Sequence, residues 1–420
     1  MNVKCSHYRA VWGTSPVVAI AGMIIVLVAG ASPLSAAERT ADAAIKAGLA
    51  WLAEHQIKEG PDAGAWQTSR PQYKPAMAAF AGLAFLANGY QPSQGEYGQV
   101  IDRAMEFVIG SMDAEGYLGQ GDPSGMYIHA ICTLFGLSYL GASPDPEREV
   151  ELAKWCRRSL KVIIDAQAIP RPATAQGGWR YTPYTTESDL SVTSWQMLVL
   201  HAARQCGYRI DRSVTDAALA YINRAYTEVE PKDSATNDDE PRSRSRDTSV
   251  HETRRRGDRP DDTSGRDSPN FHESGKGAAG FVYRVGVSTE PEPSATGVAI
   301  FIKSLFEKEA DEKVRESLAF LRKFPPSWGG EQYGGYYYFA LFYISQGMFQ
   351  VGGGTWERYR LAVAEILIEH QNGDGSWPFP PDNRPQSRLT GDSYSTALAI
   401  LVLSLEKQYL PMYQRQKSLF

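Results

Sequence analysis

The feature that most constrains the fold of this chain is a repeat with a period near 50 residues. Each unit contains a helix-like segment, a Gly- or Pro-rich turn and an aromatic residue. In the first unit "KAGLAWLAEHQ" (46–56) leads to "GAW" (64–66), and in the last "AVAEILIEHQ" (362–371) leads to "GSW" (375–377). A period of this length indicates units that bury their apolar faces against one another. The aromatic residues of the six units are Trp66, Tyr117, Trp179, Phe281, Trp328 and Trp377.

Each unit is predicted to contain two helices. The helix before the aromatic residue is amphipathic, as the spacing of Ile45, Leu49 and Leu52 illustrates. The helix after it is apolar on nearly all sides and must be buried. Because an open array of such helices would expose its inner wall, we predict an all-α fold, an α/α toroid of six outer/inner helix pairs. The inner helices are expected at 75–89, 126–142, 191–207, 294–308, 333–349 and 393–407.

One long segment interrupts the fourth unit. Residues 230–276 are dense in charges of both signs and nearly devoid of aliphatic side chains. Such a segment cannot bury enough apolar surface to order itself. We therefore expect a disordered charged insertion within the repeat domain.

The N-terminus has the layout of a secretory signal peptide. Lys4 and Arg9 precede an apolar run at 17–30, and small residues stand at Ser35 and Ala37. We expect residues 1–37 to be a signal peptide cleaved near Ala37, and residues 38–420 to form the toroid in the periplasm or cell envelope. A retained N-terminal anchor is the alternative.

Composition and cysteine spacing exclude several classes of protein. A net charge of −5 argues against a dedicated nucleic-acid binder. Cys132, Cys156 and Cys206 are widely spaced, and the chain contains no CxxC. This pattern indicates neither a disulfide framework nor a zinc knuckle. Three buried thiols are expected, with one disulfide as the alternative.

The segments "KAGLAWLAEHQ…GAW" and "EHQNGDGSW" resemble the Gln–Trp repeat of squalene and oxidosqualene cyclases. With "GGWRYTP" (177–183) and "SVTSWQ" (191–196), the chain looks similar to exported bacterial prenyltransferase and squalene oxidase repeat proteins, of the kind numerous in Planctomycetes. The resemblance implies the toroid of terpenoid cyclases and protein prenyltransferases. Its repeat residues are interpreted as fastenings between helices. They are Gln56, Trp66, Trp179, Trp328, Gln371 and Trp377.

The catalytic motifs of these families are not found at the matching positions. No Asp-x-Asp-Asp motif precedes an inner helix; the nearest analogue is Asp189, a candidate catalytic acid whose alternative role is a helix N-cap. The positions that resemble the prenyltransferase zinc ligands hold Tyr333, Gly335 and Ser395. These are poor zinc ligands. We therefore expect neither a metal nor a cofactor.

The central cavity is the remaining candidate site. The N-termini of the inner helices should converge at one mouth of the ring, where their free N–H groups favour an anionic group. Aromatic residues of the inner helices either stack on a ligand there or fill the ring as core. The candidate cavity residues are His129, Trp195, Tyr336, Tyr337 and Asp392.

The favoured function is binding of a ligand or partner in the cavity, without the family's zinc or Asp-x-Asp-Asp chemistry. Two alternatives stay open: a terpene-cyclase-like isomerase acting on an isoprenoid, and a toroid polysaccharide lyase. The partner is then a small molecule, an isoprenoid lipid, a glycan or a protein, and peripheral contact with a membrane is compatible with export.

Overall fold

A computed structural model describes residues 36–228, 279–307 and 312–413. Residues 1–35 of the predicted signal peptide and the whole predicted insertion at 230–276 lie outside these residues. Within the described ranges no helix is both long and apolar enough to cross a membrane.

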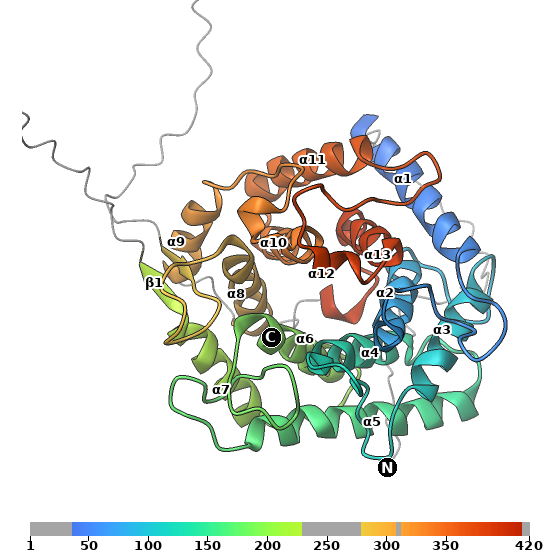
Figure 1. Cartoon of the computed structure of the whole chain (residues 1–420), viewed down its shortest axis with the longest axis horizontal. Coiled ribbons are helices and arrows are strands. Elements are labelled where there is room, and N and C mark those ends of the chain that lie inside the picture. Colours follow the sequence, from blue (N-terminus) through green and yellow to red (C-terminus); the bar gives the residue numbers. More distant parts are fainter. Residues whose placement is uncertain (1–35, 229–278, 308–311, 414–420) are drawn as a thin grey trace, which may run out of the picture.

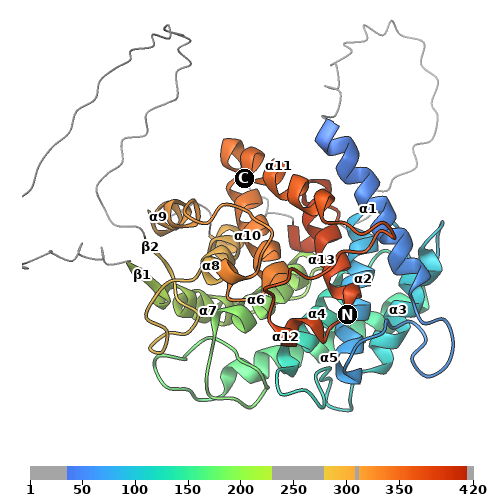
Figure 2. The same ribbon diagram turned by 45° about the horizontal axis from the view of Figure 1, so that its top comes forward.

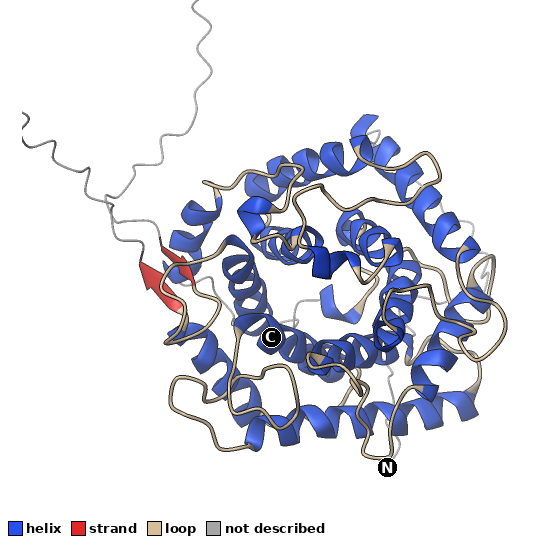
Figure 3. Cartoon of the chain, in the orientation of Figure 1, coloured by secondary structure: helices blue, strands red, loops and turns tan. Residues whose placement is uncertain are grey.

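The described residues form two concentric rings of helices, and this confirms the predicted all-α toroid (Figures 1 and 3). In the inner ring each helix contacts the next, and α13 returns to contact α2. The inner helices are α2 (Lys74–Ala87), α4 (Gly125–Tyr139), α6 (Leu190–Gln205), α8 (Pro293–Phe306), α10 (Tyr337–Val351) and α13 (Asp392–Leu403). The outer helices are α1 (Ala36–Glu54), α3 (Gly98–Gly110), α5 (Pro146–Ala168), α7 (Arg212–Arg224), α9 (Glu312–Leu321) and α11 (Gly353–Glu369).

Short elements complete the chain. Strands β1 (Tyr226–Glu228) and β2 (Ala279–Phe281) pair antiparallel at the outer edge, beside α7 and α9 (Figure 2). In the described residues, helix α12 (Pro385–Arg388) and four 3₁₀ turns lie between or after the long helices. The 3₁₀ turns are η1 (Pro71–Tyr73), η2 (Glu331–Tyr333), η3 (Leu405–Lys407) and η4 (Pro411–Tyr413).

The repeated glutamines join consecutive outer helices. Gln56 Nε2 donates to Gly64 O in its own turn and to Val100 O in α3, at 3.3 and 2.9 Å. Gln371 Nε2 donates in the same way to Gly375 O and to Ala44 O in α1, both at 2.9 Å. The amide therefore reaches the neighbouring outer helix, and Gln371 joins the last unit to the first.

The tryptophans of three units hold the turn against its own outer helix. Trp66, Trp179 and Trp377 are fully buried. Their indole N–H groups donate to Leu52 O, Ile163 O and Leu367 O, respectively, at 2.6–2.8 Å. Each indole therefore satisfies a carbonyl near the C-terminal end of an outer helix, where intrahelical donors run out.

Trp328 does not follow this arrangement. It is only partly buried and stacks on His370, with ring centroids 4.1 Å apart. The fifth unit carries Pro325 at the position of Gln56 and Gln371, so no side-chain amide stands at that position to bond the neighbouring unit. The aromatic residue of this unit packs across the junction with the sixth unit instead.

The turn glycines are required by close approach to the next helix. Gly64 and Gly375 both have φ +96°, a conformation that favours glycine. A Cβ at Gly64 would lie 2.1 Å from Arg103 O, and one at Gly375 would lie 2.5 Å from Ala47 O. The Gly-x-Trp turn is thus shaped by backbone contact between units.

The middle of the ring is filled by side chains. Trp195 of α6 stacks on Phe342 of α10, with ring centroids 5.6 Å apart and planes at 9°. Tyr343 packs edge-on against the same indole. At one end of the ring the C-terminal turn η4 packs on α6, and Gln350 Nε2 donates to Tyr413 O. The aromatic core and this segment leave the opposite end as the open one.

Helix α10 begins later than the predicted residue 333. Gly334 and Gly335 have φ values of +65° and +82°, outside the helical region. Its first free N–H group, that of Tyr337, donates to Asn383 Oδ1 at 3.1 Å. The two glycines place residues 333–336 in the loop at the open end of the ring.

Candidate functional site

A pocket of about 600 Å³ lies at the open end of the ring. Its walls come from residues in or just before the first turns of α4, α6, α8, α10 and α13, and from the first half of α2. The predicted convergence of inner-helix N-termini at one mouth is therefore confirmed. Its aromatic lining comprises Tyr73, Phe80, Tyr127, Tyr181, Trp195, Tyr283, Tyr333, Tyr336, Phe339 and Tyr394.

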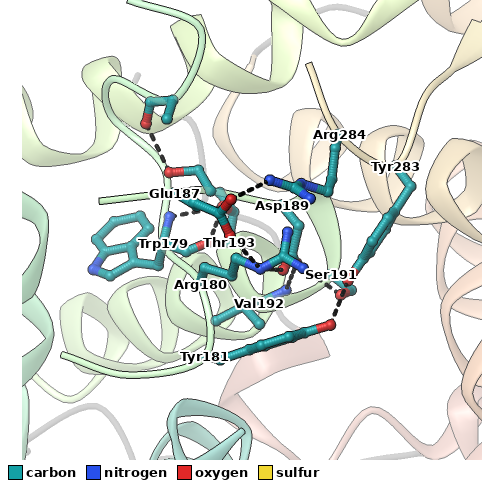
Figure 4. Close-up of polar contacts among 12 residues, drawn as sticks. Trp179, Arg180, Tyr181, Glu187, Asp189, Ser191, Val192, Thr193, Tyr283 and Arg284 are labelled. Carbon is teal, nitrogen blue, oxygen red and sulfur yellow. Dashed lines mark hydrogen bonds and ion pairs between the residues drawn. The ribbon is translucent and has the colours of Figure 1, made fainter. Parts of the chain in front are cut away.

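One wall is a cluster of hydroxyl groups. Tyr127 OH is hydrogen-bonded to Ser191 Oγ. Ser191 Oγ in turn donates to Asp189 Oδ1 at 2.8 Å (Figure 4). Tyr181 OH lies 3.2 Å from Tyr283 OH. Since Ser191 gives its proton to Asp189, its oxygen accepts from Tyr127. The Tyr127 oxygen therefore keeps lone pairs that can accept from a ligand.

Asp189 lies behind this wall and caps α6. Its carboxylate is fully buried, and Oδ1 accepts from Val192 N–H at 2.8 Å. Burial raises the pKa of Asp189 above its ordinary value, although these hydrogen bonds and the Arg180 guanidinium oppose the shift. Arg180 Nε lies 3.8 Å from Oδ2. The structure thus gives Asp189 the N-cap role, and it is not among the residues that line the pocket.

An ion-pair bridge fixes the wall on the α8 side. Glu187 lies 3.3 Å from Arg180 Nε and 2.8 Å from Arg284 Nη2 (Figure 4). The backbone N–H of Leu190 donates to Tyr283 O at 3.0 Å. These contacts bind the segment after β2 to the loop before α6, and so position Tyr283 beside Tyr181.

Two carboxylates and one guanidinium are the charged groups among the described residues that line the pocket. Asp122 is 9% exposed; its Oδ1 accepts from Ser124 N–H at 2.7 Å, and no protein group in the described ranges bonds its Oδ2. Desolvation raises the pKa of Glu292, against the opposing effect of Arg384. The Arg384 guanidinium lies 5.3 Å from the centre of the Tyr336 ring.

Of the five predicted cavity residues, Trp195 and Tyr336 line the pocket. Tyr337 is instead buried against Trp328. Asp392 begins α13 but is not part of the pocket lining.

His129 faces the outer ring rather than the cavity. Its side chain is fully buried, with Nε2 3.0 Å from Ser159 O in α5 and its ring 5.4 Å from that of Tyr117. Burial lowers the pKa of His129 to about 4. The histidine is therefore a neutral core residue, and its assignment to the cavity is corrected.

Sequence reasoning missed several residues of the pocket. The rule that singled out Asp189, an acid just before an inner helix, applies equally to Asp122 before α4 and Glu292 before α8. By contrast, Tyr181 and Tyr283 come from loops whose proximity no spacing predicts. Arg384 likewise bonds Gly334 O, which stands 50 residues earlier in the chain.

The structure weakens the expectation that the mouth favours an anionic group at two of the inner helices, α6 and α10. The protein supplies its own acceptors there: Asp189 Oδ1 bonds the Val192 N–H of α6, and Asn383 Oδ1 bonds the Tyr337 N–H of α10. Side chains therefore already satisfy part of the positive potential of these helix ends.

Metal ligation has no candidate group in the described part of the chain, where no three His, Cys, Asp or Glu side chains gather. Of the positions that resemble zinc ligands, Tyr333 lines the pocket and Ser395 Oγ donates to Trp377 O. Within the same ranges Cys132, Cys156 and Cys206 are buried free thiols.

No family model and no curated protein matches the sequence. Among solved structures, the type II terpene cyclase MstE from Scytonema is similar with a TM-score of 0.50 and 13% identity, over 89% of this chain and 99% of that one. A variant of the alpha-1,6-mannanase GH76A of Salegentibacter sp. HEL1_6, in complex with alpha-1,6-mannotriose, has a TM-score of 0.49 and 10% identity, over 87% and 99%. At such identities the similarity to the cyclase shows the toroid fold alone.

Proposed function

We propose that this toroid binds a small organic ligand in the pocket at its open mouth. The observation that carries the proposal is a cavity of about 600 Å³ with aromatic walls above a filled ring. That volume lies within the range of roughly 300–1,000 Å³ of small-molecule sites. Aromatic faces with hydroxyl and carboxylate groups at their edges give such a ligand both contact area and orientation.

The interior disfavours the isoprenoid-cyclase alternative. A polyene needs an apolar channel that ends at an acid, but Trp195 and Phe342 fill the ring below the pocket. Asp189, the candidate acid, does not line the pocket and is separated from it by Ser191 and Tyr127. The polar side of the lining supports a glycan-like ligand better than a lipid.

Mass spectrometry of protein purified from its native envelope tests this proposal. A co-purifying glycan or other small molecule should be present in the wild type and lost in Tyr336→Ala, because Tyr336 is 44% exposed on the pocket wall. Tyr409→Ala is the matched control: Tyr409 is 41% exposed and does not line the pocket. Equal occupancy in all three proteins, or none in any, would contradict the proposal.

Export is part of the same proposal. It is supported by the basic, apolar and small-residue regions of the N-terminal 37 residues. Protein recovered from the cell envelope should have the mass of a chain whose first residue lies near Glu38. A mass that includes residues 1–37, or recovery from the cytoplasm, would show that the segment is not a cleaved signal.

A further inference from the structure

We propose that the ligand of the mouth pocket is a neutral, hydroxyl-rich ring compound, a small oligosaccharide, and that the pocket rejects anionic ligands. This inference rests on the proposed function and specifies its ligand. It follows from three observations on the charged and polar groups of the pocket: one unsatisfied carboxylate, side-chain caps on two of the inner helices, and neutral polar groups from several elements of the lining.

The unsatisfied carboxylate is that of Asp122. Its Oδ1 is engaged by the Ser124 N–H, whereas Oδ2 has no hydrogen bond from the described residues although Asp122 is nine-tenths buried. A buried carboxylate oxygen without a donor costs free energy. A ligand hydroxyl would supply that donor. A phosphate or carboxylate would instead bring further acceptors and a like charge.

Side chains cap two of the inner helices at the mouth, and this weakens the usual reason for an anion to bind there. Asp189 and Asn383 accept from the first turns of α6 and α10, and Glu292 stands directly before α8. Arg384, the cationic side chain in the described lining, donates from Nε to Gly334 O at 2.7 Å. Asp122 and Glu292 line the same pocket, and their carboxylates would repel an anion there.

The perimeter of hydroxyl groups distinguishes a saccharide from an amine. An ammonium concentrates its charge and donors at one point, whereas a sugar has hydroxyls around its edge and C–H faces that pack on aromatic rings. Here neutral polar groups come from several separate elements around the aromatic walls. They are Ser124, Tyr127, Tyr181, Ser191, Tyr283, Ser294, Gln386 and Thr390.

Calorimetric titration of the whole protein at pH 7 tests the inference. The probes are neutral trisaccharides of glucose, mannose, galactose and xylose, with trigalacturonate and farnesyl diphosphate as anions and the glucosamine trimer as a cation. At least one neutral trisaccharide should bind more tightly than every charged probe. Asp122→Asn should weaken its binding at least about 10-fold, since a hydrogen bond to a charged acceptor is lost.

The control variant is Asp392→Asn, an acid at the start of another inner helix that does not line the pocket. It should bind within about twofold of the wild type. In Asp122→Asn the amide oxygen still accepts from Ser124 N–H, so the turn before α4 is kept, and an unchanged melting temperature would verify this.

Tighter binding of trigalacturonate, farnesyl diphosphate or the glucosamine trimer overturns the inference on ligand class. If that binding is lost in Tyr336→Ala, the proposed function survives. If wild type and Asp122→Asn bind the neutral trisaccharide with equal affinity, the Asp122 carboxylate does not contribute to binding. If no probe binds, the inference fails, and the mass-spectrometric comparison then decides the proposed function separately.

Discussion

At the scale of single residues, two aspartates in similar sequence positions have different surroundings. Asp122 and Asp189 each stand just before an inner helix. The bridge between Trp179 and Asp189 draws Asp189 into the core, where it caps α6. Asp122 lies in a turn that faces the pocket and keeps one oxygen free of protein donors. The residue type is the same in both cases. The surrounding backbone determines that Asp189 has a structural role and that Asp122 faces the pocket.

Replacement of Asp189 separates these roles. Asp189→Ala removes the acceptor of Val192 N–H and should lower the free energy of unfolding by about 1–2 kcal/mol, the usual cost of a lost N-cap. Asp189→Asn keeps an oxygen acceptor and should cost less. Urea unfolding measures both variants. An equal loss in the two variants would show that the negative charge, which both remove, matters rather than the cap.

His129 predicts a specific pH dependence. Its ordinary pKa is 6.5 and its folded value is about 4, because burial penalises the imidazolium. Between these values the unfolded chain binds more protons, so stability present above pH 6.5 is lost as pH falls towards 4. The loss is at most about 3 kcal/mol. The difference between the urea midpoints at pH 7 and pH 4.5 should be smaller in His129→Gln than in the wild type. An equal difference in the two proteins would refute the assignment of this pH dependence to His129.

At the scale of helices and turns, one motif has two kinds of partner. The glutamine amide bonds the next outer helix, whereas the indole N–H bonds the outer helix of its own unit. The glycine between them lies so close to the next helix that a side chain would clash. Each turn therefore specifies both the position of its helix and the angle to the neighbouring unit.

The difference between Trp377 and Trp328 gives a test at this scale. Trp377→Ala should reduce the free energy of unfolding by about 3–5 kcal/mol, since a fully buried indole and its hydrogen bond are lost. Trp328→Ala should cost less, because Trp328 is only partly buried. Chemical denaturation of the two variants compares them directly. Similar losses in the free energy of unfolding would mean that Trp328 stabilises the contact between units as strongly as Trp377 does.

At the scale of the whole molecule, closure of the ring determines what can be removed. The inner ring is continuous from α2 to α13, and Gln371 bonds α1 across the junction. By contrast, β1 and β2 end at the outer edge, where Glu228 pairs with Ala279 in register. The segment between these strands starts and finishes at adjacent points outside the two rings.

Replacement of residues 232–274 by a short Gly–Ser loop should therefore leave the melting temperature nearly unchanged. The paired ends already lie together, so a short connection spans them without strain. Calorimetry of the wild type and the shortened chain measures the effect. A drop of more than about 5 °C, of order 1 kcal/mol or more for a chain of this size, would mean that the insertion contributes to the folded core.

The amino-acid sequence by itself determined the repeat, the two helix classes and the toroid, because apolar periodicity and the Gln–Gly–Trp spacing are local patterns. It also identified Trp195 and Tyr336 and the capping alternative for Asp189. Only the tertiary structure decided which end of the ring is open, that the ring centre is filled, and that Asp122, Tyr181, Tyr283 and Arg384 meet at one pocket. These facts depend on contacts between residues far apart in the chain, and no local pattern encodes the direction in which a side chain at a shared helix end will point.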